Sequence, residues 1–263
     1  MLNIPNINYY SKSISFKANN SYDSKENNIK NLVPDFILPQ GVYIDPFSGE
    51  NEYKKDYMEK LYQTYFDENG KMNPEITKFL DNEIFEIELQ YPAGEKINST
   101  LKDYIRASFR NPFPISDTVC HGTGAYLHAK DIINNGFDPK FIKRTNLGPG
   151  FYFSSEEYAR LYGILLKADF KGIIADANAK FYESIEKSNA KNKLSEFLGF
   201  SNEFSAKSML QSEFSKYLLN EYCRNFIVEG LGIDAGRGVC GNAAGESCLC
   251  VYNPRTLTNI RGE

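Results

Sequence analysis

Two short stretches of the sequence carry residue types that could do chemistry. The first, TVCHGTGAY at Thr118 to Tyr126, places one of the chain's two histidines among glycine and threonine, where a core residue would usually be apolar. The second, LGPGFYFSSEEY at Leu147 to Tyr158, combines glycines with aromatic and hydroxyl side chains. His121 is therefore a candidate site residue, with a structural role in a turn as the alternative.

Two familiar kinds of site do not fit these stretches. Cys120 beside His121 suggests a thiol–imidazole dyad, but neighbours on a strand point to opposite faces, which argues against one. Gly148 and Gly150 are too few for a dinucleotide-binding fingerprint, since no strand-loop-helix unit with an acidic residue about 20 positions on accompanies them. We expect neither site.

Other polar residues have simple structural interpretations. Glu86 and Glu88 fall in a predicted helix, where positions two apart diverge. His128 falls on the helix predicted after the first strand, which favours a surface or packing role. Asp234, in GIDAG, is favoured as a turn residue. The five cysteines lack paired CxxC spacing, which predicts free thiols and no zinc site.

Composition excludes some classes of protein. The formal net charge is −4, charged residues make up 24%, and no basic block stands out, so the charge does not indicate a nucleic-acid partner. No apolar run approaches the roughly 18 residues that a membrane span needs, and no Sec-type signal opens the chain. These features predict a protein that works in a cytosol-like compartment.

The first part of the chain is expected to be mostly helical. Residues 1–30 are rich in Asn, Ser and Lys, which predicts a flexible leader, with a secretion signal as the sharper alternative. Apolar spacing predicts helices from Glu52 to Phe66 and from Pro74 to about Leu89, and Thr100 caps a third that ends before Asn111-Pro112. Residues 31–112 are thus expected to form a helical region.

Beyond residue 112 the pattern changes to short β-prone runs separated by glycine. Strands are predicted over DTVCHGT, GFYF, GILLKADFKGIIADA, GIDAG and CLCVYNP. Helices are predicted over AYLHAKDIINNG, from Ser154 through Tyr162, and across residues 177 to about 228. The fold class is therefore α+β, with the strands divided by a helical insertion.

The order of these motifs resembles that of the diphtheria-toxin and poly(ADP-ribose) polymerase-like ADP-ribosyltransferases, whose motif residues are His, Tyr and often Glu. A His-Gly-Thr strand is followed about 30 residues later by Gly-x-Gly-Phe-Tyr-Phe, by Tyr162, and by GIDAG ahead of a last segment, VYNPRTLTNI. The resemblance covers residues 113–263 and implies an ADP-ribosyltransferase-like split β-sheet with an insertion at about 177–228.

The resemblance implies a role for each motif residue in binding NAD as substrate. His121 would hydrogen-bond the ribose of the adenosine half, and Gly122 would offer its backbone to the carboxamide, because a missing Cβ allows close approach. Thr123 would add a hydroxyl contact. Tyr152 and Tyr162 would sandwich the nicotinamide ring, with ordinary strand packing as the alternative for Tyr152.

Two further positions depart from the family pattern or leave alternatives open. Family members often carry a serine three residues before the second tyrosine, but this chain has Ala159, so Ser154 or Ser155 would have to supply that contact. Arg144, before LGPG, would contact the pyrophosphate or remain a solvated loop charge.

The third motif residue is the least regular. Counting back from Asn253-Pro254, the usual glutamate position falls on Cys248, and the nearest acid is Glu246. Residues two apart on a strand share a face, so we predict Glu246 as the catalytic carboxylate. If Cys248 occupies the position, another base is needed and chain elongation is not expected.

The resemblance therefore predicts a mono-ADP-ribosyltransferase that transfers ADP-ribose from NAD to a host protein, with ubiquitin as one candidate acceptor. The leader and the Asn/Lys/Ile-rich composition suggest a secreted bacterial effector or toxin that acts in the host cytosol. An NAD glycohydrolase is one alternative. An RNA 2′-phosphotransferase would be expected to carry more basic residues. The alternative outside enzymes is a degenerate module that binds NAD or ADP-ribose.

Overall fold

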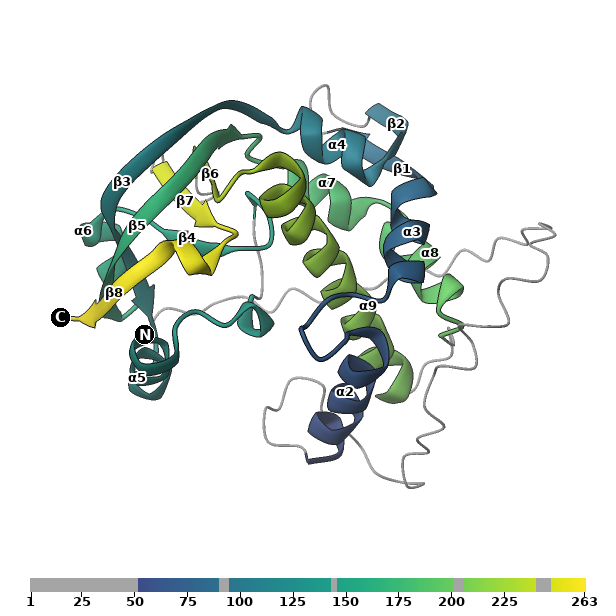
Figure 1. Ribbon diagram of the computed structural model, residues 1–263, viewed down its shortest axis with the longest axis horizontal. Helices are drawn as coiled ribbons and strands as arrows, with labels where there is room; N and C mark the ends of the chain where they lie inside the picture. Colours follow the sequence, from purple (N-terminus) through teal and green to yellow (C-terminus); the bar gives the residue numbers. More distant parts are fainter. Residues whose placement is uncertain (1–51, 90–94, 143–145, 201–205, 240–246) are drawn as a thin grey trace, which may run out of the picture.

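A helical part, a two-stranded sheet and a six-stranded sheet make up the described part of the molecule (Figure 1). The computed structural model describes residues 52–89, 95–142, 146–200, 206–239 and 247–263. The helices are α2 (Glu52–Tyr65), α3 (Pro74–Asn82), α4 (Leu101–Ala107), α5 (Tyr126–Asn135), α6 (Glu156–Arg160), α7 (Phe181–Lys187), α8 (Ala190–Phe197) and α9 (Ala206–Asn225), which runs on as a π-helical turn over Phe226–Gly230. The strands are β1 (Ile84–Leu89), β2 (Glu95–Thr100), β3 (Phe109–Thr123), β4 (Phe151–Phe153), β5 (Ile164–Ala177), β6 (Ala235–Val239), β7 (Ser247–Val251) and β8 (Leu257–Gly262). The predicted α+β class is confirmed at this level.

The long strand β5 organises the large sheet. One of its edges pairs with β3 in antiparallel fashion from end to end. The other edge is shared, because residues 166–170 pair with β8 and residues 174–176 pair in parallel with β6. β7 and β4 continue from β6, so the strands form two groups of three, β3-β5-β8 and β6-β7-β4. An isolated bridge between Cys120 and Ser154 brings β4 back to β3.

Asp234 joins the two groups of strands. Its carboxylate accepts hydrogen bonds from the backbone N–H of Ile173 on β5 (2.8 Å) and from the side-chain amide of Asn253 (2.7 Å). Its own backbone N–H donates to the Ile173 carbonyl at 2.8 Å, and its carbonyl accepts from the N–H of Tyr252 at 2.9 Å. The role of Asp234 in this structure is therefore to connect β5, β6 and the turn after β7.

Alternation along β4 and β7 sends side chains into two different cores. Phe153 and Val251 lie with Phe137 and the β5 residue Phe170 in a core enclosed by the sheet. Tyr152, between the two β4 phenylalanines, instead packs on a larger core shared with the helices. Each face of the β4–β7 pair is thus buried against a different partner.

The N-terminal helices and the predicted insertion pack together. Their shared core includes buried residues of α2, α3, α4, α7, α8 and α9, and α9 runs between the sheet and the first two of these helices (Figure 1). Polar contacts join the same parts: Tyr222 donates to Asp81 at 2.7 Å, and Lys193 pairs with Glu83 at 2.6 Å. Segments far apart in sequence therefore form one helical body beside the sheet.

The predicted helix from Pro74 to Leu89 is wrong in its second half. α3 ends at Asn82, and residues 84–89 form β1, because Phe85 and Ile87 alternate with polar residues and are buried. Glu86 and Glu88 therefore share a strand face, contrary to the helical interpretation. Glu86 pairs with Lys96 across the hairpin at 3.5 Å, as an exposed ion pair.

Smaller differences concern one cap and one cysteine. Ser155, not Ser154, caps α6 by accepting a hydrogen bond from the Tyr158 N–H at 3.3 Å. The expectation of free thiols holds for Cys120 and two other described cysteines but is wrong for Cys248, which is disulfide-bonded. The predicted leader, residues 1–30, lies outside the described residues.

Candidate functional site

β3 and β4 separate immediately after their bridge. The Ser154 N–H donates to the Cys120 carbonyl at 3.0 Å. If the ladder continued, Gly122 would pair with Tyr152, because backbone groups on one edge of a strand recur every second residue. Within the residues that the structure describes, no backbone hydrogen bond links Gly122 to β4. The amide and carbonyl of Gly122 are thus unpaired on the β4 side among the described residues, and this interruption of the ladder between Gly122 and Tyr152 is called the opening.

The His121 imidazole lies at one side of this opening, with Nδ1 toward Tyr152. Its Nδ1 lies 2.8 Å from the Tyr152 carbonyl oxygen, so Nδ1–H donates there and takes the acceptor that Gly122 would use in a continued ladder. The ring packs against Phe137 and Phe153, with centroid distances of 5.2 and 5.6 Å. With Nδ1 protonated, Nε2 of the neutral ring is a hydrogen-bond acceptor. The structure therefore gives His121 the tautomer that can accept a hydrogen bond from a hydroxyl group.

Burial lowers the pKa of His121 below its ordinary value of 6.5, against the smaller opposing effect of its hydrogen bond to Tyr152. Its neighbour Cys120 faces the other way, as alternation predicted, and contacts Ala159 and Leu165. Burial raises the pKa of the Cys120 thiol. The two residues therefore form no thiolate–imidazolium pair.

Tyr152 holds the loop that leads into β4. Its hydroxyl accepts a hydrogen bond from the Leu147 N–H at 2.7 Å, and the buried Tyr252 hydroxyl donates to the Leu147 carbonyl. Both backbone groups of Leu147 are thus fixed by tyrosines. Sequence reasoning missed Tyr252 in this role; a tyrosine in an otherwise apolar run, CLCVY, was the available signal.

Helix α6 covers β3 at Gly122. A Cβ on Gly122 would lie 1.9 Å from the Ala159 carbonyl oxygen and 2.9 Å from the Tyr162 Cβ, so only glycine fits. Tyr162 is 56% exposed, and its hydroxyl lies 2.9 Å from that of Tyr158. Gly122 and Tyr162 are therefore neighbours, and a large aromatic face is available to solvent beside the opening.

Charged side chains fasten α6 to the sheet. Lys167 on β5 pairs with Glu156 at 2.8 Å and also with Glu263 at the end of β8. Arg160 on α6 pairs with the same two carboxylates, at 2.7 and 2.9 Å. Each pair is partly solvated and weak alone, but the four charges form a network. This network fixes the position of α6 over Gly122.

The remaining predicted site residues are distributed as follows. Thr123 is buried at the end of β3. Ala159 is buried and offers no hydroxyl, and the hydroxyl of Ser155 is used in the α6 cap. Arg144 and Glu246 lie outside the described residues. Cys248 lies on the Tyr152 face of β7 and is disulfide-bonded, so it offers neither a thiolate nor a carboxylate.

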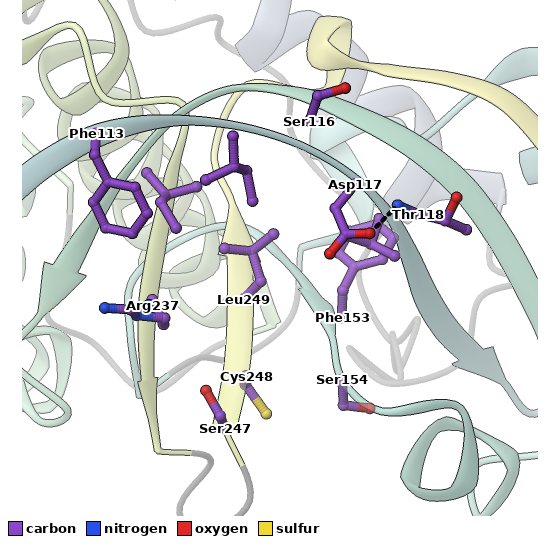
Figure 2. A pocket seen from close by; sticks show the side chains of 13 residues that line it. Phe113, Ser116, Asp117, Thr118, Phe153, Ser154, Arg237, Ser247, Cys248 and Leu249 are labelled. Carbon is purple, nitrogen blue, oxygen red and sulfur yellow. Dashed lines mark hydrogen bonds between the residues drawn. The ribbon is translucent and has the colours of Figure 1, made fainter.

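A separate hollow of about 370 Å³ lies on the other side of the bridge between Cys120 and Ser154 (Figure 2). Its walls come from β3, the end of β4, β6 and β7. Asp117 lines it, a residue that the sequence analysis did not single out. The available signal was a carboxylate at a β3 position whose neighbours two residues away, Ile115 and Val119, are apolar.

The described part of the chain supports neither a metal site nor a membrane-spanning helix. No group of three or more His, Cys, Asp or Glu residues there could hold a metal ion. Among the helices described, none has the length and apolar character to cross a bilayer.

No protein-family model, curated protein or solved structure matches this chain. The assignment of function therefore rests on the geometry of the site.

Acidification should destabilise the fold through His121. Because its pKa is lower in the folded chain, the unfolded chain takes up a proton first as the pH falls below 6.5, and this uptake favours unfolding. Above that pH both states are neutral at this residue. We expect urea unfolding between about pH 7 and about pH 5 to show a steeper loss of stability in the wild type than in His121→Phe. Equal slopes in the two proteins would contradict the expectation.

Proposed function

We propose that this protein is a mono-ADP-ribosyltransferase that uses NAD as its substrate, releases nicotinamide and transfers ADP-ribose to a host protein. The observation that carries the proposal is the opening between β3 and β4, where the backbone of Gly122 has no partner on β4 among the described residues and His121 holds the Tyr152 carbonyl. The division of the sheet into β3-β5-β8 and β6-β7-β4 supports the expected split β-sheet of an ADP-ribosyltransferase-like fold.

The chemistry of this opening suits nicotinamide. A carboxamide has one carbonyl and one NH₂ group, which complement the N–H and carbonyl of Gly122. The exposed ring of Tyr162 can stack on the pyridinium, adding about 1 kcal/mol and attracting its positive charge. His121 Nε2 can accept a hydrogen bond from a ribose hydroxyl. Tyr152 contributes through its fixed backbone carbonyl and the face of its ring.

The bond that breaks joins nicotinamide to ribose, and its transition state is an oxocarbenium ion that negative charge stabilises. Glu246 is the proposed source of that charge, next to the first residue of β7. The presence of a cysteine at position 248 supports this choice, because Cys248 offers no carboxylate whether its sulfur is free or disulfide-bonded. Arg144 is proposed to contact the pyrophosphate, and Thr123 is proposed to support the end of β3.

The proposed partner is a host protein, with ubiquitin as one candidate acceptor. The proposed setting is the host cytosol, which the protein would reach by secretion, with the leader as the secretion signal. A second candidate function is a degenerate module that binds NAD or ADP-ribose. Ala159 and Cys248 favour it, because a hydroxyl and a carboxylate are missing at the positions where family members carry them. An NAD glycohydrolase would use the same opening without an acceptor.

Labelled NAD distinguishes these functions. We expect the full-length protein, incubated with a eukaryotic lysate and NAD labelled in the adenine half, to label a protein band, while NAD labelled in nicotinamide gives free nicotinamide. Glu246→Gln should abolish both signals, and Glu86→Gln, a change of the same kind on the β1 surface, should leave them unchanged. Free nicotinamide without a band would indicate a glycohydrolase. Binding of NAD without either signal would indicate the binding module.

A further inference from the structure

The hollow beyond the bridge has an apolar floor, and among its described lining residues the carboxylate of Asp117 lies at the rim. Five side chains of the sheet's enclosed core form the floor: Ile115, Val119, Phe153, Ile174 and Leu249. Asp117 is exposed and points into the hollow from β3 (Figure 2). One of its oxygens accepts from the Thr118 N–H at 2.8 Å. In the part of the chain that the structure describes, no cation pairs with it.

The other charges around the hollow are neutralised locally. Arg237 donates to Asp176 at 2.6 and 3.1 Å and stacks on the Phe113 ring, 5.2 Å from its centroid. Asp169, on β5 opposite Thr118 of β3, pairs with Arg261 at 3.1 Å. Among the described residues, Asp117 is therefore left as the net negative charge at the rim, and a cation is the ligand charge that complements it.

The size of the hollow limits what can enter. Ligand pockets span about 300–1,000 Å³, and at about 370 Å³ this one lies at the small end. A dinucleotide would not fit, which separates the hollow from the NAD opening. A long side chain with an alkyl stem and a cationic head matches an apolar floor beneath a carboxylate, because such residues bury the stem and leave the head at the surface.

The hollow also lies beside the proposed site of reaction. Phe153, the last residue of β4, and Ser154 directly follow Tyr152, and Val119 precedes His121 by two residues on the same face of β3. Ser247 and Cys248, which complete the wall, begin β7 immediately after the proposed catalytic position. A protein segment anchored in the hollow would therefore lie next to His121 and Tyr152 of the proposed NAD site.

We propose that this hollow receives a lysine or arginine side chain of the acceptor protein, with the cationic head on Asp117 and the stem on the apolar floor. The proposal rests on the proposed transferase function. It assigns Asp117 a role in acceptor recognition and none in the binding or cleavage of NAD.

Asp117→Asn tests the charge alone, since asparagine keeps an oxygen that can accept from the Thr118 N–H. We expect this variant to raise the KM for the acceptor protein about tenfold, because one charged hydrogen bond is lost. The affinity for NAD and the release of nicotinamide in the absence of acceptor should stay at wild-type levels. Asp56→Asn, an exposed change on α2, is the matched control and should alter neither quantity. An unchanged acceptor KM in Asp117→Asn would overturn the proposal.

Small probes test the pocket without an acceptor. The methylamides of N-acetyl-lysine and N-acetyl-arginine should shift backbone NMR signals of the wild type around the hollow but not those of Asp117→Asn, and the tighter probe identifies the preferred head group. N-acetyl-norleucine methylamide, which has no charge, should bind about tenfold more weakly. Equal binding of the neutral probe would overturn the proposal. A wild type that binds these probes but not NAD would instead show that the transferase function is wrong.

Discussion

Gly122→Ala is expected to lower the affinity for NAD at least about tenfold and the free energy of unfolding by about 2 kcal/mol. The added Cβ would lie 1.9 Å from the Ala159 carbonyl oxygen, which is backbone and cannot rotate away. α6 must therefore move off β3, taking Tyr162 with it. Isothermal titration with NAD and urea unfolding measure the two effects.

Gly124→Ala is the matched control for this change. Two residues further on, an added Cβ would meet only the Tyr162 carbonyl oxygen at 3.7 Å, an ordinary contact. Stability and NAD affinity should both stay close to those of the wild type. If Gly122→Ala unfolds earlier but binds NAD with unchanged affinity, the opening at Gly122 is not the nicotinamide site.

Local patterns predicted those parts of the fold that neighbouring residues determine. The cap at Thr100 is present, since its hydroxyl accepts from the Asp103 N–H, and Gly136 ends α5 with a φ of 82°. The opposite directions of Cys120 and His121 followed from strand alternation. Each of these features depends on a few consecutive residues, which the sequence displays directly.

Features that depend on distant residues were not predictable in this way. Residues 84–89 contain strong helix formers, but pairing with residues 95–100 buries Phe85 and Ile87, and tertiary packing outweighs propensity. The bonds from Asp234 to Ile173 and Asn253 join positions that only the folded sheet brings together. The packing of the N-terminal helices on α9 was not predicted for the same reason, because it also joins residues that are distant in the sequence.

The candidate site combines residues that the sequence pattern predicted with a contact that it did not predict. The motifs led to His121, Gly122 and Tyr152, and the structure brings these three together at one opening. It could not be foreseen that the imidazole would bond the Tyr152 carbonyl and so leave Gly122 without its ladder partner. That arrangement arises between two strands about 30 residues apart, so no local sequence pattern displays it.

His121→Phe should reduce the release of nicotinamide from NAD about hundredfold, the size of effect seen when one positioned hydrogen-bonding group is removed from an active site. Phenylalanine can keep the contacts with Phe137 and Phe153 but offers no nitrogen to the Tyr152 carbonyl or to a ribose hydroxyl. Phenylalanine keeps a flat aromatic ring at this position, so the loss would report the nitrogens if urea unfolding shows that the variant is as stable as the wild type at pH 7. His128→Phe, at the exposed second histidine on α5, is the control and should retain full activity.

Hydrogen exchange gives this prediction a readout that does not depend on catalysis. In the wild type the Gly122 amide has no partner on β4 among the described residues, so it should exchange quickly. In His121→Phe the Tyr152 carbonyl is released, and the Gly122 N–H can take it and extend the ladder from the bridge at Cys120. Slower exchange at Gly122 together with lost activity would show that His121 acts by keeping the strands apart as well as by binding. Lost activity with unchanged exchange would confine its role to contacts with the substrate.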